Sequence, residues 1–234
     1  MPHPHGSVVI VGAGDGLSAS LARRFARDGH DIVLAARDTD KLASLAEETG
    51  ARSIACDASD PAAVDALFDA VPERLAIVVH NPSARTRGPV AELDPEAVRH
   101  ALEVTAFGAF LVGRRAAARM LDQDEADGAR GTILFTGASA GVKGFPRSAP
   151  FAMGKFAQRG LAQSMSRELH PRGVHVAWIN IDGQIGNPRI EADPERPDAM
   201  LDPAAIADTY AALSCQHRSA WSEEVAVRPW TETF

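Results

Sequence analysis

The fold is decided by the stretch Val8-Val9-Ile10-Val11-Gly12-Ala13-Gly14-Asp15-Gly16-Leu17-Ser18, which joins an apolar run to a turn with three glycines. The apolar run predicts a buried strand, and Leu17, Leu21 and Phe25 then recur at helical spacing. A side chain in the turn would keep the backbone away from a ligand's pyrophosphate, whose charge helix N-terminal amides meet. Because the glycines directly follow an apolar strand, the pattern favours nucleotide binding over a tight turn without a ligand.

Composition limits the class of protein. The chain has 234 residues, of which 45% are hydrophobic, so we expect residues 1–234 to form a single domain. The net charge is -7 and no basic run occurs, which argues against binding to nucleic acid or an anionic membrane surface. Cys56 and Cys215 lack metal-like spacing, so no metal site is expected and both are interpreted as reduced thiols of a cytoplasmic protein.

Apolar runs alternate with helical patterns along the chain, as in βα units around a parallel sheet. The predicted strands are 8–11, 31–35, 53–55, 75–80, 132–135 and 174–179, with a last strand near Val225. The predicted helices begin at Leu17 and then cover 41–48, 61–70, 95–121, 151–169 and 203–213. The order implies an α/β fold, a Rossmann-type doubly wound parallel sheet in three α/β/α layers, with the ligand beyond the carboxyl ends of the strands.

Charged residues after the second and third strands bear on the nucleotide. Arg37 follows the second strand, where an arginine accommodates a 2′-phosphate and an acidic residue would bind ribose hydroxyls. Arg37 therefore indicates NADP, although NAD stays possible because Asp15 in the glycine turn would repel a 2′-phosphate. Asp57, after the third strand, is either an acceptor for an adenine amine or a turn residue before a helix.

Over nearly its whole length the chain resembles the short-chain dehydrogenase/reductase family. The family's Thr-Gly-x-x-x-Gly-x-Gly turn corresponds to 11–18, with the first threonine and the final glycine replaced. Its aspartate in the third βα loop matches Asp57, and its Asn-Asn-Ala-Gly falls on 80–83 with only Asn81 retained. The resemblance implies these cofactor contacts: Gly12, Gly14, Asp15, Gly16, Leu17, Arg37, Asp57, Ala58, Asn81, Lys155 and Ile185.

The catalytic segment departs from the family pattern. A gapless alignment from Gly131 places Phe151 and Lys155 on the family's Tyr-x-x-x-Lys, whose two side chains share one helix face. The catalytic serine position falls on Ala138, with Ser139 one residue later, and the helix asparagine falls on Thr105. The resemblance gives the tyrosine the role of general acid or base, the lysine that of holding the nicotinamide ribose, and the serine that of orienting the carbonyl.

A phenyl ring neither donates nor accepts a proton, so Phe151 leaves the usual carbonyl chemistry without its acid. Substitute donors are Ser139, Ser148 or an ordered water, although loop or capping roles are preferred for both serines. Two function classes follow: an NAD(P)-dependent oxidoreductase acting on a small carbonyl, alcohol or enoyl substrate, or an NADP(H)-binding protein without turnover.

The C-terminal part carries the remaining expectations. The segment 182–185 resembles the family's Pro-Gly-x-Ile loop, whose isoleucine contacts the nicotinamide carboxamide through its backbone. Residues 183–202 then fit either a substrate lid or a plain surface loop. Trp221 and Trp230 belong either to the core or to a contact with a neighbouring subunit, and the resemblance favours a homodimer or homotetramer.

Overall fold

A computed structural model of the chain describes residues 5–71, 74–126, 128–187, 195–196 and 198–231. It contains a seven-stranded sheet in the order β3-β2-β1-β4-β5-β6-β7, and every neighbouring pair runs parallel. The order reverses between β1 and β4, so the chain winds outward in both directions from these two strands. The predicted doubly wound α/β architecture is confirmed.

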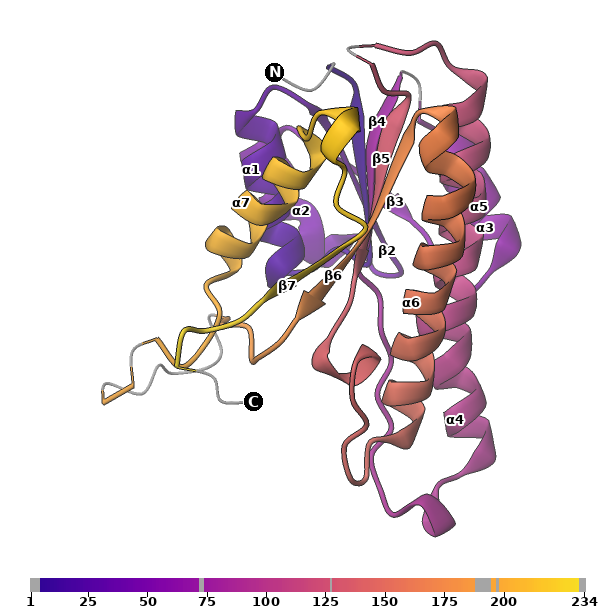
Figure 1. Cartoon of the computed structure of the whole chain (residues 1–234), viewed down its shortest axis with the longest axis vertical. Coiled ribbons are helices and arrows are strands. Elements are labelled where there is room, and N and C mark those ends of the chain that lie inside the picture. The colour runs from indigo at the N-terminus through magenta and orange to yellow at the C-terminus, as the bar shows by residue number, and fades with distance from the viewer. Residues whose placement is uncertain (1–4, 72–73, 127, 188–194, 197, 232–234) are drawn as a thin grey trace.

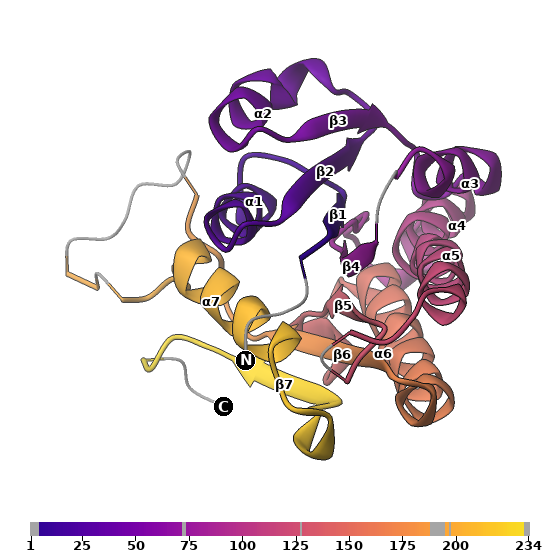
Figure 2. The ribbon, with the colours of Figure 1, turned by 90° about the horizontal axis from the view of Figure 1, so that it is seen from above.

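The elements alternate along the chain and form three layers (Figure 1). The strands are β1 Ser7–Val11, β2 Asp31–Ala36, β3 Arg52–Ala55, β4 Leu75–His80, β5 Gly131–Thr136, β6 Val174–Ile181 and β7 Glu224–Val227. The helices are α1 Leu17–Arg27, α2 Ala43–Thr49, α3 Pro61–Asp69, α4 Pro95–Leu102, α5 Gly108–Asp122, α6 Ala149–Leu169 and α7 Pro203–Ser214. Figure 2 shows α1, α2 and α7 on one side of the sheet and α3, α4, α5 and α6 on the other.

Helices bury the sheet from both sides. Val8 and Ile10 of β1 pack in one apolar cluster with residues of α1 and α7, whereas Val9 and Val11 pack in a second with residues of α3 and α5. A parallel sheet covered on both faces reads as continuous apolar runs, which is why the strands were recognisable in the sequence. A ligand site is therefore expected at the carboxyl ends of the strands, where the helices leave the sheet uncovered.

Three helices differ from the sequence prediction. The one expected over 41–48 is a 3₁₀ turn at Asp40–Leu42 followed by α2 from Ala43. The single helix expected over 95–121 is divided into α4, a π-helical turn at Glu103–Phe107, and α5. A π-helical turn adds one residue to a single turn of a helix. The spacing of apolar residues continues on both sides of it, so the sequence pattern did not predict the π-helical turn. In addition, α6 begins at Ala149, two residues before the expected start at Phe151.

The two tryptophans of the C-terminal tail have different surroundings, because Trp221 is half-buried and Trp230 is exposed. β7 pairs with β6, and Trp221 just before it stacks on His175 with 4.9 Å between ring centroids. Trp230 is 83% exposed, so its placement in the core is wrong. No helix within the described part of the chain is long and apolar enough to cross a membrane.

Gly137 directly follows β5 and packs closely against β6, so a substitution there measures how tight this packing is. A Cβ at this residue would lie 2.4 Å from the ring of Trp178 and 2.7 Å from the Ile179 carbonyl oxygen. Gly137→Ala is therefore expected to lower the free energy of unfolding by about 1–3 kcal/mol in urea titration, as overpacked sites do. The matched control is Gly160→Ala, whose Cβ meets nothing within 4 Å and which lies in α6. It should raise stability by roughly 0.5–1 kcal/mol, and equal effects of the two variants would contradict the packing.

Candidate cofactor and active site

The glycine turn after β1 combines one structural glycine with two that leave open space. Gly12 has a φ of +78°, and a Cβ there would lie 2.7 Å from the Pro82 side chain. At Gly14 and Gly16 a Cβ would meet nothing within 4 Å, yet both residues line cavities. Gly12 is thus needed by the fold itself, whereas a side chain at Gly14 or Gly16 would occupy room available to a ligand. The turn fits a bound dinucleotide.

The N-terminus of α1 points into the same region without a side-chain cap. Gly16 is the N-cap residue, no side chain accepts from the first amides, and the first turn holds no acidic residue. Ser18 donates from Oγ to the Gly12 carbonyl at 3.1 Å. It also accepts from Asn81 Nδ2 at 2.8 Å, so it braces the turn against the end of β4. Uncapped amides at a helix start favour an anion.

A cavity of about 650 Å³ lies beside the turn and contains several of the expected cofactor residues. Its charged lining residues are Asp15, Arg37, Asp38, Lys41 and Asp57, and Ala58 lines it as well. Lys41, which the sequence reasoning missed, forms an ion pair with Asp38 at 2.7 Å.

Asp57 has a local structural role in addition to lining this cavity. Its Oδ1 accepts from the hydroxyl of Ser59 at 2.7 Å and from the Ser59 amide at 2.9 Å. These hydrogen bonds, that of the hydroxyl first, hold the pKa of the carboxyl below its usual value. One carboxylate oxygen is therefore already used by the turn before α3.

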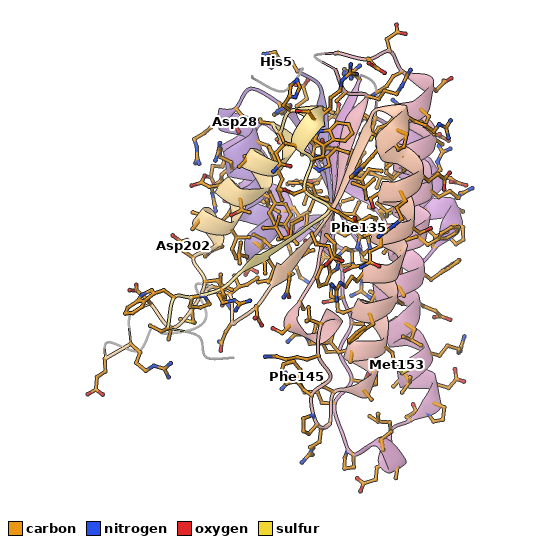
Figure 3. The ribbon with its side chains drawn as sticks, viewed as in Figure 1. His5, Asp28, Phe135, Phe145, Met153 and Asp202 are labelled. Carbon is orange, nitrogen blue, oxygen red and sulfur yellow. The ribbon has the colours of Figure 1, made fainter. Side chains whose placement is uncertain are left out.

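A larger cavity of about 1160 Å³ adjoins the first and shares Asn81 and Ser83 with it. The structure brings these sequence-predicted residues to its walls: Gly16, Leu17, Asn81, Ala138, Ser139, Ser148, Phe151, Lys155 and Ile185. Figure 3 shows Phe145 of the β5–α6 loop and Met153 of α6 at the same end of the molecule. The loops after β4, β5 and β6 therefore converge at one place.

Thr105 is the expected catalytic residue that lines neither cavity. It is fully buried in the π-helical turn, and its Oγ1 accepts from the Ala84 amide at 3.1 Å. A Cβ at Gly154 would lie 2.9 Å from Thr105 Cβ, so α6 packs closely on this turn. Thr105 thus holds the loop after β4 in place from behind, because its side chain is directed at the backbone of that loop.

Lys155 is buried at the wall of the larger cavity, with only 2% of its surface exposed, and is not a solvated surface lysine. Its Nζ donates to the Thr136 carbonyl at 2.6 Å and to Gln158 Oε1 at 3.3 Å. Burial, and then the charge of Arg85, lower the pKa of the amine from 10.5 to about 7. Both protonation states of Lys155 are therefore accessible near neutral pH.

A buried polar chain continues from Lys155 into the core. Gln158 Nε2 lies 3.2 Å from His80 Nδ1, which makes the imidazole nitrogen the acceptor. Burial, and then the charge of Lys155, lower the pKa of His80 to about 3, so the ring stays neutral. Gln158 was not recognised in the sequence because an amide three residues after the lysine matches no motif.

Arg85 and Phe151 form a contact that sequence reasoning also missed. The Arg85 guanidinium carbon lies 4.2 Å from the centroid of the Phe151 ring, in cation–π geometry. The sequence does contain a charge pattern that points to this region. Segments 81–91 and 131–155 have arginines or lysines but no Asp or Glu, although the chain as a whole is acidic. Phe151 thus presents an apolar ring to the larger cavity, and a guanidinium lies over it.

The loop after β6 is tied to the segment before α7. The Leu201 amide donates to the Gln184 carbonyl at 2.8 Å, and the Gly186 amide donates to the Leu201 carbonyl at 2.9 Å. These bonds fix Ile185 at the cavity wall. Within the predicted lid at 183–202, residues 188–194 and 197 lie outside the described part of the chain.

Comparisons with known proteins agree with this geometry. The family model for short chain dehydrogenase matches residues 7–183. The L-2,3-butanediol dehydrogenase of Corynebacterium glutamicum is 30% identical over 76% of this chain and 71% of its own length. A short-chain dehydrogenase structure from Rhodopseudomonas palustris is 34% identical, covers 96% of this chain and 98% of its own, and superposes with a TM-score of 0.82. A metagenomic short-chain oxidoreductase solved in complex with NADP is 28% identical, covers 96% and 97%, and has a TM-score of 0.81.

The lowered pKa of Lys155 predicts how stability changes with pH. The unfolded chain holds the lysine proton up to about 10.5 and the folded chain only to about 7, so folding releases a proton between these values. Relative to Lys155→Met, the wild-type free energy of unfolding should therefore rise as pH increases from 7 towards 10. Denaturant titrations of both proteins at several pH values measure this difference, in which the other ionisable groups cancel. A difference that stays constant with pH would contradict the buried, proton-losing lysine.

Proposed function

Because the chain belongs to the short-chain dehydrogenase family and is an NAD(P)-dependent oxidoreductase, we propose that it uses NADP(H) to reduce or oxidise a small carbonyl, alcohol or enoyl substrate. One observation carries the proposal: a cavity beside an open glycine turn joins, at Asn81, a second cavity that contains Lys155. In this proposal the first cavity holds the nucleotide, and the second holds the small substrate beside the nicotinamide end of that nucleotide.

The preference for NADP(H) is supported by cations after β2. Arg37 and Lys41 both line the smaller cavity, where they suit a 2′-phosphate. Asp15, Asp38 and Asp57 on the same walls limit this preference, and Lys41 is partly engaged by Asp38. The relative solved in complex with NADP favours the same assignment.

In this proposal the amides at the start of α1 and the turn at Gly14 and Gly16 hold the pyrophosphate. Asp57 and Ala58 lie against the adenine, Arg37 against the 2′-phosphate, and Lys155 and Ile185 against the nicotinamide half. When bound, the nicotinamide donates or accepts the hydride. The chain's own residues then have to orient the substrate and handle one proton.

We assign that proton to Lys155, because Phe151 has no exchangeable hydrogen. A carbonyl that gains a hydride becomes an alkoxide; the ammonium of Lys155 donates a proton to its oxygen and is left as the neutral amine. Burial favours this transfer, since the pKa of the amine near 7 matches the operating pH of a general acid. Ser139 and Ser148 line the same cavity, and in this proposal their hydroxyls hydrogen-bond the substrate oxygen.

The proposal includes self-association as a homodimer or homotetramer. Phe107 and Phe110 stack on each other with centroids 6.2 Å apart and are exposed beside α5. Met153 and Phe156 are exposed on the neighbouring helix α6. Large apolar side chains gathered on two adjacent helices are typical of a protein interface.

The nucleotide preference is tested at Arg37. Arg37→Ala should weaken NADPH binding about tenfold or more, the equivalent of about 1.4 kcal/mol, and change NADH binding less than twofold. Fluorescence titration of both nucleotides measures the two dissociation constants. Arg27→Ala, which removes an exposed arginine from the far end of α1, is the matched control. Equal losses for NADPH and NADH would remove Arg37 as the phosphate contact.

The proton donor is tested by the pH dependence of turnover on a panel of carbonyl and enoyl substrates with NADPH. In the reducing direction wild-type kcat should fall as pH rises above about 7, since the ammonium of Lys155 is lost. Lys155→Met should lower kcat by about 10²–10⁴-fold. Phe151→Tyr adds a phenol with a pKa of about 10 and should extend activity to higher pH.

Two results would contradict the assignment of Lys155 or the proposed turnover. A wild-type kcat that is independent of pH would exclude Lys155 as the donor. Tight NADPH binding without turnover of any substrate in the panel would favour the second function class, a nucleotide-binding protein in which Phe151 has replaced the acid.

A further inference from the structure

We infer that the larger cavity selects a substrate carrying a carboxylate or phosphate group, which Arg85, Arg87 and Arg147 recognise. This inference rests on the proposed function, because it names the substrate class of the same site. The two acids share one chemistry, a compact oxyanion, and the experiment below separates them.

The first argument is the charge of the cavity wall. Arg85, Arg87, Arg147 and Lys155 line the larger cavity, and no Asp or Glu of the described residues does so. The whole chain carries 31 acidic against 24 basic residues, and the adjoining smaller cavity includes three aspartates. The absence of carboxylates is therefore local to the substrate half of the site and runs against the composition of the chain.

The second argument is that these arginines have no anionic partner among the described residues. Within the part of the chain that the structure describes, no ion pair joins Arg85, Arg87 or Arg147 to a carboxylate. Elsewhere, arginines do form such pairs: Arg23 with Glu48 at 2.7 Å and Arg159 with Glu224 at 2.7 Å. Guanidinium groups gathered around a cavity without a counter-charge are suited to an anion from outside the chain.

The third argument is that the Arg85 side chain and the Arg147 backbone each make a defined contact, although both residues are exposed. The Arg85 guanidinium carbon lies over the Phe151 ring, 4.2 Å from its centroid, so one side of the guanidinium rests on an apolar surface. Arg147 has a φ of 60°, a left-handed conformation uncommon outside glycine, and its carbonyl accepts from the Gly88 amide at 3.2 Å. This bond ties the loop after β5 to the loop after β4, so arginines from two loops line one space.

The apolar surroundings make an anion more favourable. Phe145, Phe151 and Ile181 line the same walls, and attraction between charges grows where water is displaced. The neighbouring charge of Arg87 adds to burial in lowering the pKa of Arg85, which shows that the two cations repel each other in the free chain. A carboxylate or phosphate that bridges them relieves this repulsion and accepts in the bidentate way that arginine favours.

The experiment compares benzoate, phenyl phosphate and benzamide, which share a ring and differ in charge, on the full chain saturated with NADPH. Isothermal titration calorimetry should show that benzoate or phenyl phosphate binds at least tenfold more tightly than benzamide. The tighter of the two anions identifies the carboxylate or the phosphate as the recognised group. Benzamide that binds as tightly as both anions would overturn the inference.

Single variants locate the binding group. Arg85→Gln, Arg87→Gln and Arg147→Gln should each weaken the preferred anion at least fivefold while leaving benzamide and NADPH binding within twofold. Arg172→Gln, which removes an exposed arginine beside the start of β6, is the matched control and should change nothing. Losses in the three variants no larger than in the control would overturn the inference.

The outcomes also separate this inference from the proposed function. NADPH binding without anion selectivity contradicts the inference and leaves the NADP(H) proposal standing. Anion binding that is sensitive to the three arginines in a chain that does not bind NADPH supports the inference for the cavity and contradicts the proposed use of NADP(H).

Discussion

The hydrogen-bonded tie between the ends of β1 and β4 is the constraint on which the site depends. Asn81, directly after β4, makes two such bonds: its amide donates to the Val11 carbonyl of β1 at 3.0 Å, and its side chain donates to Ser18 Oγ of α1 at 2.8 Å. Ser18 in turn holds the Gly12 carbonyl. The sheet reverses direction between these strands, so the tie fixes the two halves of the molecule to each other where a ligand has to cross between them.

The two cavities differ in the charge of their lining residues, although Asn81 lines both of them. The smaller cavity mixes cations and carboxylates, whereas the described walls of the larger cavity bear cations alone. The charge of Arg85 adds to burial in lowering the pKa of Lys155. The cations of the larger cavity and the protonation state of Lys155 therefore influence each other.

The sequence was sufficient for the fold because the strands are buried on both faces and appear as apolar runs of the right length. It also located the glycine turn, Arg37 and Lys155, since each depends on a position within one βα unit. It did not reveal the π-helical turn, the Gln158–His80 contact or the stacking of Arg85 on Phe151. The two contacts pair residues from different βα units, and the π-helical turn alters the backbone within a helix. None of them changes the periodic spacing of apolar residues on which the sequence prediction depends. The same limit explains Thr105, which was assigned to catalysis by alignment and is directed at the backbone of Ala84.

The contact between Thr105 and Gly154 makes the position of the loop after β4 depend on the absence of one methyl group on α6. An alanine at 154 would place its Cβ 2.9 Å from Thr105 Cβ and 3.0 Å from Thr105 Cγ2. A serine at 105 would remove Cγ2 but keep Cβ, so no residue that retains a hydroxyl at 105 makes room for a side chain at 154. Helix α6 would instead have to move away from the π-helical turn whose Thr105 Oγ1 accepts from the Ala84 amide. A glycine that lines neither cavity therefore sets the distance between α6 and the turn that holds the loop carrying Arg85.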